Sequence, residues 1–226
     1  VDPQCRHFFK CGGCTLQHWK FKNYKSWKFN KVSSPILKLS SNTLIKPTIT
    51  SSIKTRRHAK FIAKKTKTNT LIGFNEYRSY YITKISECII LDEQLVKFIN
   101  SIEEPLNDLL QIGETIDIHV NLLDNGIDLL IDGLEKVPFN KFTYLNEILI
   151  KNNVIRFNRK RSDKTTDLLF ITAKTSLSNK LFSSTVYPTP GGILQATFDG
   201  ENAILNNTIN ALENINKSRF ICELFS

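Results

Sequence analysis

The sequence has no apolar run long enough to cross a lipid bilayer and no signal-peptide core near its start. The expected setting is therefore the cytoplasm, without a membrane partner, where thiols stay reduced. Cysteine is also scarce, with 5 among 226 residues. A reducing setting disfavours disulfides and favours a metal-binding or catalytic role for cysteines that lie close together.

Acidic residues are scarce in the first 90 residues, which contain 3 Asp and Glu against 18 Lys and Arg. The remaining chain contains 18 against 13, so the net charge of +10 comes from the first part. This asymmetry favours a polyanionic partner such as nucleic acid, although an AT-rich genome would also enrich lysine. The alternative for a basic block of this kind is a solvated strand face. The candidates for phosphate contacts, called the basic block below, are Lys54, Arg56, Arg57, Lys60, Lys64, Lys65 and Lys67.

Hydrophobic periodicity predicts an α+β fold that starts with a helix. Trp19, Tyr24 and Trp27 allow a helical stripe that ends near "SSP" at residues 33–35, with the aromatic rings in the core. Three strands joined by polar turns are predicted between residues 54 and 88.

The middle of the chain predicts a helix followed by a hairpin. Asp92 is the candidate N-cap, and Pro105 is expected to kink the helix or divide it. The segment "TIDIHVNLLDNGIDLLIDG" alternates apolar and polar residues around Asn125-Gly126, a pattern typical of a hairpin. A helix near residues 141–152 and strands near 153–157 and 167–173 complete this mixed unit.

The C-terminal part has a different pattern. A Pro/Gly-rich loop, "PTPGG", leads into a helix, and "SRFICELFS" is a short apolar run of the kind that begins a parallel α/β sheet. No further strand follows it. We therefore expect one domain over residues 1–180 and the first elements of a second, Rossmann-like α/β domain over residues 181–226.

Three cysteines lie close together in "CRHFFKCGGC", where Cys5, Cys11 and Cys14 surround two flexible glycines. Thiolates at this spacing can share a metal, and both tetrahedral zinc and a 4Fe–4S cluster take a fourth ligand. Cys88, at a predicted strand-to-helix junction, is the favoured fourth ligand. Cys222, inside the last apolar run, is expected to be a buried and inert thiol. The spacing alone leaves zinc and iron–sulfur equally open.

Three segments together carry a resemblance to a known family: "CRHFFKCGGCTLQHW", "IGFNEYRSYYITKISECIILDEQL" and "GGILQATFDGENAILNNTINAL". They resemble the RNA uracil-5-methyltransferases, which use S-adenosylmethionine to make 5-methyluridine in ribosomal or transfer RNA. The resemblance covers nearly the whole chain, and its wording is closest to a bacterial branch that acts on ribosomal RNA. It implies a monomeric enzyme with an RNA partner, with ribosomal RNA favoured over transfer RNA.

The resemblance also implies the cofactors and their ligands. A 4Fe–4S cluster is expected on Cys5, Cys11, Cys14 and Cys88, in a structural role, with residues 1–180 as the cluster-bearing, RNA-binding domain. S-adenosylmethionine is expected to contact Gln195 and Phe225 in the methyltransferase domain that begins at residue 181. The nucleophilic cysteine and the general base of the family are expected beyond Ser226, so no catalytic residue is assigned. The alternative is a non-enzymatic iron–sulfur or zinc RNA-binding module from a split or decaying gene.

Overall fold

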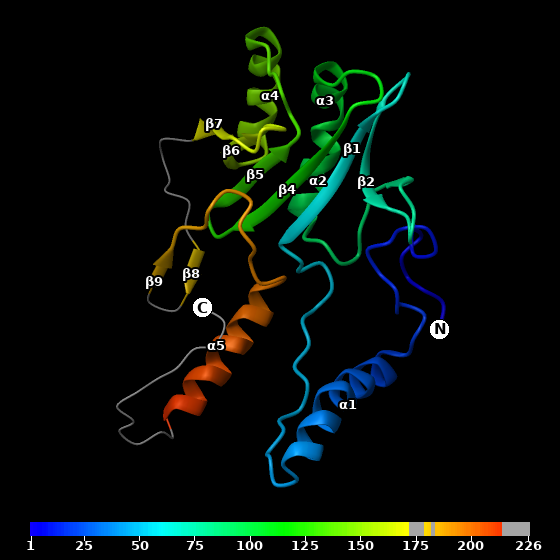
Figure 1. The fold of residues 1–226 in the computed structure, drawn as a ribbon, viewed down its shortest axis with the longest axis vertical. Helices are drawn as coiled ribbons and strands as arrows, with labels where there is room; N and C mark the ends of the chain where they lie inside the picture. The colour runs from blue at the N-terminus through cyan, green and yellow to red at the C-terminus, as the bar shows by residue number, and fades with distance from the viewer. Residues whose placement is uncertain (172–178, 182–183, 214–226) are drawn as a thin grey trace.

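A seven-stranded sheet forms the centre of the computed structural model, which describes residues 1–171, 179–181 and 184–213 (Figure 1). The strand order is β3-β2-β1-β4-β5-β6-β7, and neighbouring strands are antiparallel except β5 and β6, which are parallel. The mixed helix-and-sheet fold agrees with the predicted class. The strands are β1 (His58–Lys65), β2 (Thr70–Asn75), β3 (Ile82–Lys84), β4 (Thr115–Leu123), β5 (Gly126–Asp132), β6 (Val154–Lys160) and β7 (Thr166–Ile171).

Three helices cover one face of this sheet and lie behind it in Figure 1: α2 (Glu93–Ser101), α3 (Glu103–Leu109) and α4 (Phe139–Lys151). The carboxylate of Asp92 accepts a hydrogen bond from the Gln94 amide at 2.8 Å, which confirms the predicted N-cap. The helical segment divides at Ile102, three residues before Pro105, as predicted.

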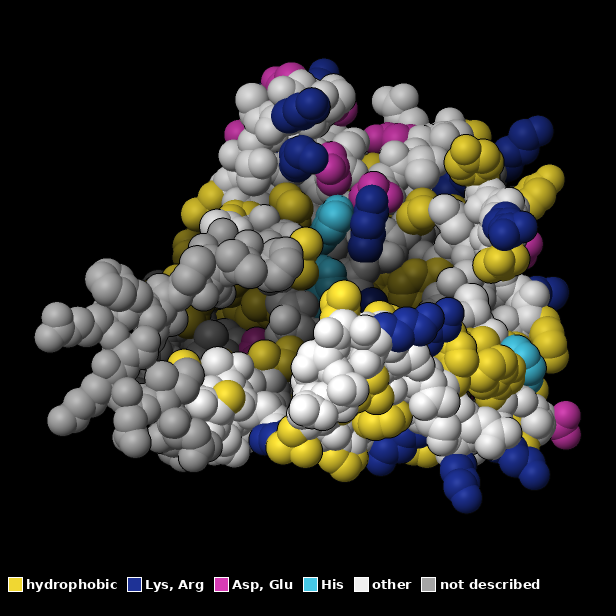
Figure 2. Space-filling model, turned by 60° about the horizontal axis from the view of Figure 1, so that its bottom comes forward, with side chains coloured by type: hydrophobic (Ala, Val, Ile, Leu, Met, Phe, Trp, Pro, Cys, Tyr) yellow, Lys and Arg dark blue, Asp and Glu magenta, His cyan; other side chains and the backbone are white. Residues whose placement is uncertain are grey.

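The opposite face of the sheet carries the polar side chains. On β1, His58 and Lys60 alternate with buried Ala59 and Phe61, and Lys60 lies opposite His119 of β4. The space-filling view in Figure 2 shows a hollow in which histidine, basic and acidic side chains gather. The two-residue period of the strands therefore separates an apolar face from a polar one.

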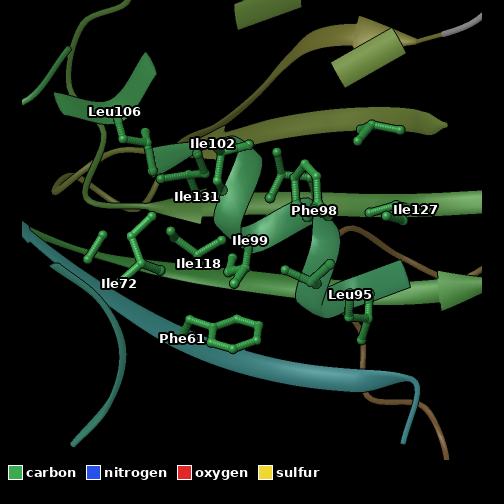
Figure 3. Close-up of a cluster of buried hydrophobic side chains, with 14 of the residues drawn as sticks. Phe61, Ile72, Leu95, Phe98, Ile99, Ile102, Leu106, Ile118, Ile127 and Ile131 are labelled. Carbon is green, nitrogen blue, oxygen red and sulfur yellow. The ribbon is translucent and has the colours of Figure 1, made fainter. Parts of the chain in front are cut away.

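The hydrophobic core lies between the sheet and the helices. Figure 3 shows Phe98 and Ile99 of α2 directed at the sheet, where they meet residues of β1, β4 and β5 such as Phe61, Ile118 and Ile127. All these side chains are at most 1% exposed. On β5, "GIDLLID", every residue before Asp132 is buried, including Asp128.

The first helix differs from its prediction. α1 (Phe21–Leu39) does not end at "SSP" but continues through Pro35, and the Ser40 amide closes its last turn on the Ile36 carbonyl at 2.9 Å. A proline within a helix removes one donor without removing the donors that follow it, so the helix can resume. The aromatic stripe is not in the core either, because α1 buries only Ser33. Its rings pack against each other, with Trp19 and Trp27 centroids 5.9 Å apart.

The C-terminal part reaches back to the sheet through a loop. The side chain of Asn121 donates to the Gly192 carbonyl at 3.0 Å, and Arg156 donates to the Pro188 carbonyl at 2.9 Å. The strands β8 (Asn179–Leu181) and β9 (Ser184–Val186) form a separate pair, and α5 (Phe198–Glu213) follows. Cys222 and Phe225 lie outside the described residues, as does the predicted last strand. Within the described ranges, no helix is long and apolar enough to cross a membrane.

Candidate functional site

The four predicted metal-binding cysteines line one cavity of about 280 Å³. Cys5, Cys11 and Cys14 come from the N-terminal loop, residues 1–20, and Cys88 comes from the segment between β3 and α2. All four thiols are free and partly buried. The structure thus brings together residues that are more than 70 positions apart in the sequence.

Backbone contacts hold the N-terminal loop against the β2–β3 hairpin. Cys11 forms an antiparallel bridge with Glu76, and the Gly12 amide donates to the Asn75 carbonyl at 2.8 Å. A Cβ atom at Gly12 would lie 2.7 Å from that carbonyl oxygen, so the approach requires glycine at this position.

A second set of contacts ties the same loop to the Cys88 segment. The guanidinium of Arg6 lies 2.7 Å from the Glu87 carboxylate and donates to the Ser86 hydroxyl at 2.5 Å. These contacts sit beside Cys5 and Cys88 in the sequence. They fix the relative position of the two chain segments that supply the thiols.

The protein environment favours the neutral form of two of the four thiols. Burial raises the pKa of the Cys11 and Cys14 thiols above the ordinary value, and the neighbouring cysteines raise it further. The Gly13 amide opposes the rise at Cys11, and Gln17 and Arg56 oppose it at Cys14. The protein alone therefore supplies little stabilisation for several thiolates, whereas a bound metal would supply it.

The four thiols share a cavity without forming a preassembled metal site. Among the described residues, the structure shows no group of three or more Cys, His, Asp or Glu side chains that could hold a metal ion. A zinc ion needs all its sulfur ligands at about 2.3 Å from one centre.

The basic block does not form one surface. Lys60 and Lys64 lie on the polar face of β1, and Lys67 is exposed in the turn that follows. Arg56 lines the thiol cavity, whereas Lys54 pairs with Glu93 at 2.7 Å on the other side of the segment. Lys65 donates to the Asn107 carbonyl at 2.7 Å and is turned toward α3.

Arg57 cannot contact phosphate, because its side chain is 0% exposed. Its guanidinium lies 2.7 Å from the Glu201 carboxylate and 4.0 Å from the centroid of the Phe198 ring. It also donates to the Gln195 carbonyl at 3.1 Å, and the Arg57 amide donates to the Ala196 carbonyl at 2.9 Å. Arg57 therefore clamps the segment that carries Gln195, the predicted cofactor ligand, onto the end of β1. The Gln195 side chain itself is exposed.

Sequence reasoning missed this clamp, although a signal for it exists. Arg57 is two residues before Ala59 and four before Phe61, so it lies in the buried phase of β1. A basic side chain on the buried face of a strand is expected to pair with a buried acidic group and not with a phosphate.

The mixed sheet, the thiol cavity and the docked 195–201 segment define an α/β protein in which an N-terminal loop is fixed to the sheet.

No protein family model matches the chain. An uncharacterized RNA methyltransferase of Brucella melitensis is 29% identical over 226 residues, which cover 99% of this chain and 52% of the relative. The 23S rRNA (uracil(1939)-C(5))-methyltransferase of Shewanella woodyi is 31% identical over 132 residues, which cover 56% of this chain and 30% of the relative.

A solved structure shares the fold. The tRNA (uracil-54, C5)-methyltransferase of Pyrococcus abyssi, determined with S-adenosyl-L-homocysteine, matches with a TM-score of 0.64 at 15% identity. The match covers 94% of this chain and 52% of that structure. The chain is thus similar to RNA methyltransferases along its length. It spans about half the length of the curated relatives with which it aligns almost completely.

Proposed function

We propose that the chain is the RNA-facing part of an RNA uracil-C5 methyltransferase that takes its methyl group from S-adenosylmethionine. The observation that carries this proposal is the similarity to RNA methyltransferases over 99% of the chain. The shared fold with a tRNA uracil-C5 methyltransferase supports the chemistry, and the 23S rRNA enzyme among the relatives supports a ribosomal RNA target in the cytoplasm. The relatives do not favour the alternative of a non-enzymatic RNA-binding module.

We assign a 4Fe–4S cluster to the thiol cavity, with Cys5, Cys11, Cys14 and Cys88 as its ligands. The support is the common cavity that all four thiols line. When bound, the cluster would supply Fe–S bonds that brace the N-terminal loop against the Cys88 segment. The chain's own residues supply the frame, through Arg6 with Glu87 and through Gly12 with Asn75.

The Gln195 segment is the proposed cofactor-facing element of this chain. Arg57, paired with Glu201, holds the Gln195 backbone, which leaves the exposed Gln195 amide free to meet S-adenosylmethionine. Phe225 is the second proposed contact. The acid–base and nucleophilic groups are expected in the part of the relatives that this chain does not cover, so residues 1–226 alone should not transfer methyl groups.

The test is a deletion of the complete gene in its native organism, followed by mass spectrometry of 5-methyluridine in separated ribosomal and transfer RNA. We expect one 5-methyluridine to disappear from 23S rRNA and to return when the complete gene is restored. Loss from transfer RNA alone would correct the substrate. Unchanged 5-methyluridine in both RNA classes would contradict the proposed function.

A further inference from the structure

A second cavity, of about 400 Å³, adjoins the thiol cavity and is not used by the proposed cluster. Gly13, Lys60 and Phe74 line both cavities, so one wall is common to them. The remaining wall is the end of β2 and the loop that follows it. The residues that line this side are Asn75, Glu76, Tyr77 and Arg78.

Backbone hydrogen bonds fix the loop between β2 and β3, residues 76–81. The Glu76 amide donates to the Tyr81 carbonyl at 2.8 Å, and the Ser79 amide donates to the Glu76 carbonyl at 3.2 Å. The Tyr77 amide donates to the Lys10 carbonyl at 3.3 Å, which attaches the loop to the N-terminal loop. The cavity is therefore preformed, and a ligand would not need to order it.

The loop presents aromatic rings to solvent. Tyr77 is 60% exposed, Tyr80 is 96% exposed and Tyr81 is 77% exposed. The Arg78 guanidinium lies over the Tyr77 ring at 5.2 Å. Phe74, within the cavity, stacks on the core residue Phe61 with centroids 4.8 Å apart, so its ring is held in place. Exposed rings held by a rigid backbone are the usual platform on which unpaired bases stack.

Basic and acidic side chains both line the cavity. Arg78 forms no ion pair with any described residue, and Lys60 reaches the cavity from β1 while paired with Asp117 at 2.7 Å. Asn75 and Glu76 add an amide and a carboxylate that can bond to the edge of a base. Protein-binding surfaces are typically depleted of charge at their centre, whereas this hollow combines charge with aromatic rings.

We propose that this cavity binds one unpaired nucleotide of the RNA substrate. The base lies against Tyr77 and Phe74, and Arg78 and Lys60 meet the adjoining phosphates. This inference rests on the proposed function, which makes RNA the partner. The volume falls within the range of about 300–1,000 Å³ that is common for small-ligand sites. The inference also relates the two cavities, because Gly12 and Gly13, which lie between Cys11 and Cys14 in the chain, line the nucleotide site.

The test measures binding of residues 1–226 to a fluorescein-labelled, uridine-containing 12-nucleotide RNA by anisotropy, with a blunt RNA duplex of equal charge as the second probe. We expect Tyr77→Leu to weaken single-strand binding at least about fivefold and Tyr77→Phe to change it less than about twofold, because the phenyl ring keeps the stacking face. Arg78→Ala should lower the slope of log affinity against log salt by about one. Phe139→Leu, at an exposed aromatic on α4, is the control and should change nothing.

The outcomes separate this inference from the proposed function. If the wild-type chain binds neither RNA, the nucleotide site is wrong, and the gene deletion described above decides the proposed function separately. If it binds the single strand but Tyr77→Leu and Arg78→Ala bind equally well, the aromatic loop serves a protein contact and only the nucleotide site is wrong. If the variants lose affinity for the single strand and for the duplex equally, the residues make general phosphate contacts and the inferred nucleotide site is wrong. Unfolding does not confuse these results, because Arg78 is an exposed loop residue and circular dichroism checks each variant.

Discussion

At the scale of single residues, Arg57 shows how one buried charge can organise a functional segment. Its pair with Glu201 is 0% and 12% exposed at the two side chains, so each charge depends on the other for the solvation that water no longer provides. The same guanidinium holds the Gln195 carbonyl. The residue therefore acts on the proposed cofactor site without touching it, as a positioning residue.

The first prediction removes this charge. Arg57→Met should lower the free energy of unfolding by about 3–5 kcal/mol, because the Glu201 carboxylate would stay buried without its partner. Urea unfolding followed by circular dichroism measures the loss. Lys54→Met, which breaks the exposed pair with Glu93, is the control and should change stability little. Comparable losses of stability in the two variants would contradict the prediction, because the buried pair would then contribute no more than the exposed one.

The second prediction concerns His119 on the polar face of the sheet. Burial, with a smaller contribution from Lys60, lowers the pKa of His119 below its ordinary value of 6.5, although Asp117 and Asp132 oppose this. As the pH falls below about 6.5, the unfolded chain takes up a proton before the folded chain does, so stability declines. His119→Gln should therefore lose less stability than wild type between pH 7 and pH 5 in thermal unfolding. Identical pH profiles for the two proteins would refute this role, and His18→Gln at an exposed histidine serves as control.

At the scale of elements, the sequence was informative wherever local pattern and tertiary burial agree. The Asp92 cap, the division before Pro105 and the turn at Asn125-Gly126 were all predictable, because each depends on neighbours in the chain. The end of α1 was not, because Pro35 weakens a helix without having to end it. Whether the aromatic side chains of α1 are buried depends on whether another element packs on them, and the periodicity of the segment does not show that.

The third prediction tests the hairpin that carries the loop 76–81. A Cβ atom at Gly73 would lie 1.8 Å from the Thr83 carbonyl oxygen, which belongs to the paired strand β3. Gly73→Ala should therefore separate β3 from β2 and lower the free energy of unfolding by about 1–3 kcal/mol or more. Hydrogen exchange should show the Ile85 amide, bonded to Ile72 in the wild type, losing its protection. Lys84→Ala in the same strand introduces no clash and should keep that protection.

At the scale of the whole molecule, the candidate sites form where distant segments meet. That the four thiols lie together could be predicted, because cysteine is scarce and Cys88 lies at a predicted strand-to-helix junction; that they bind a cluster stays a prediction. The nucleotide site could not, since it exists only once Gly12 approaches Asn75 and Tyr77 bonds to Lys10. Such contacts between segments more than 60 residues apart follow from the sheet topology, which one sequence alone specifies only coarsely.

The fourth prediction uses this long-range closure. If one cluster joins Cys11 to Cys88, either Cys88→Ser or Cys11→Ser should abolish iron binding and lower the unfolding temperature to the same extent, because each variant opens the same brace. Cys222→Ser, outside the proposed ligand set, is the control and should keep its iron. Iron content, visible absorption and thermal unfolding of anaerobically purified protein provide the measurements. A Cys88→Ser protein with its full iron content would remove Cys88 from the ligand set, and a colourless wild-type protein that contains zinc would replace the cluster by a different metal site.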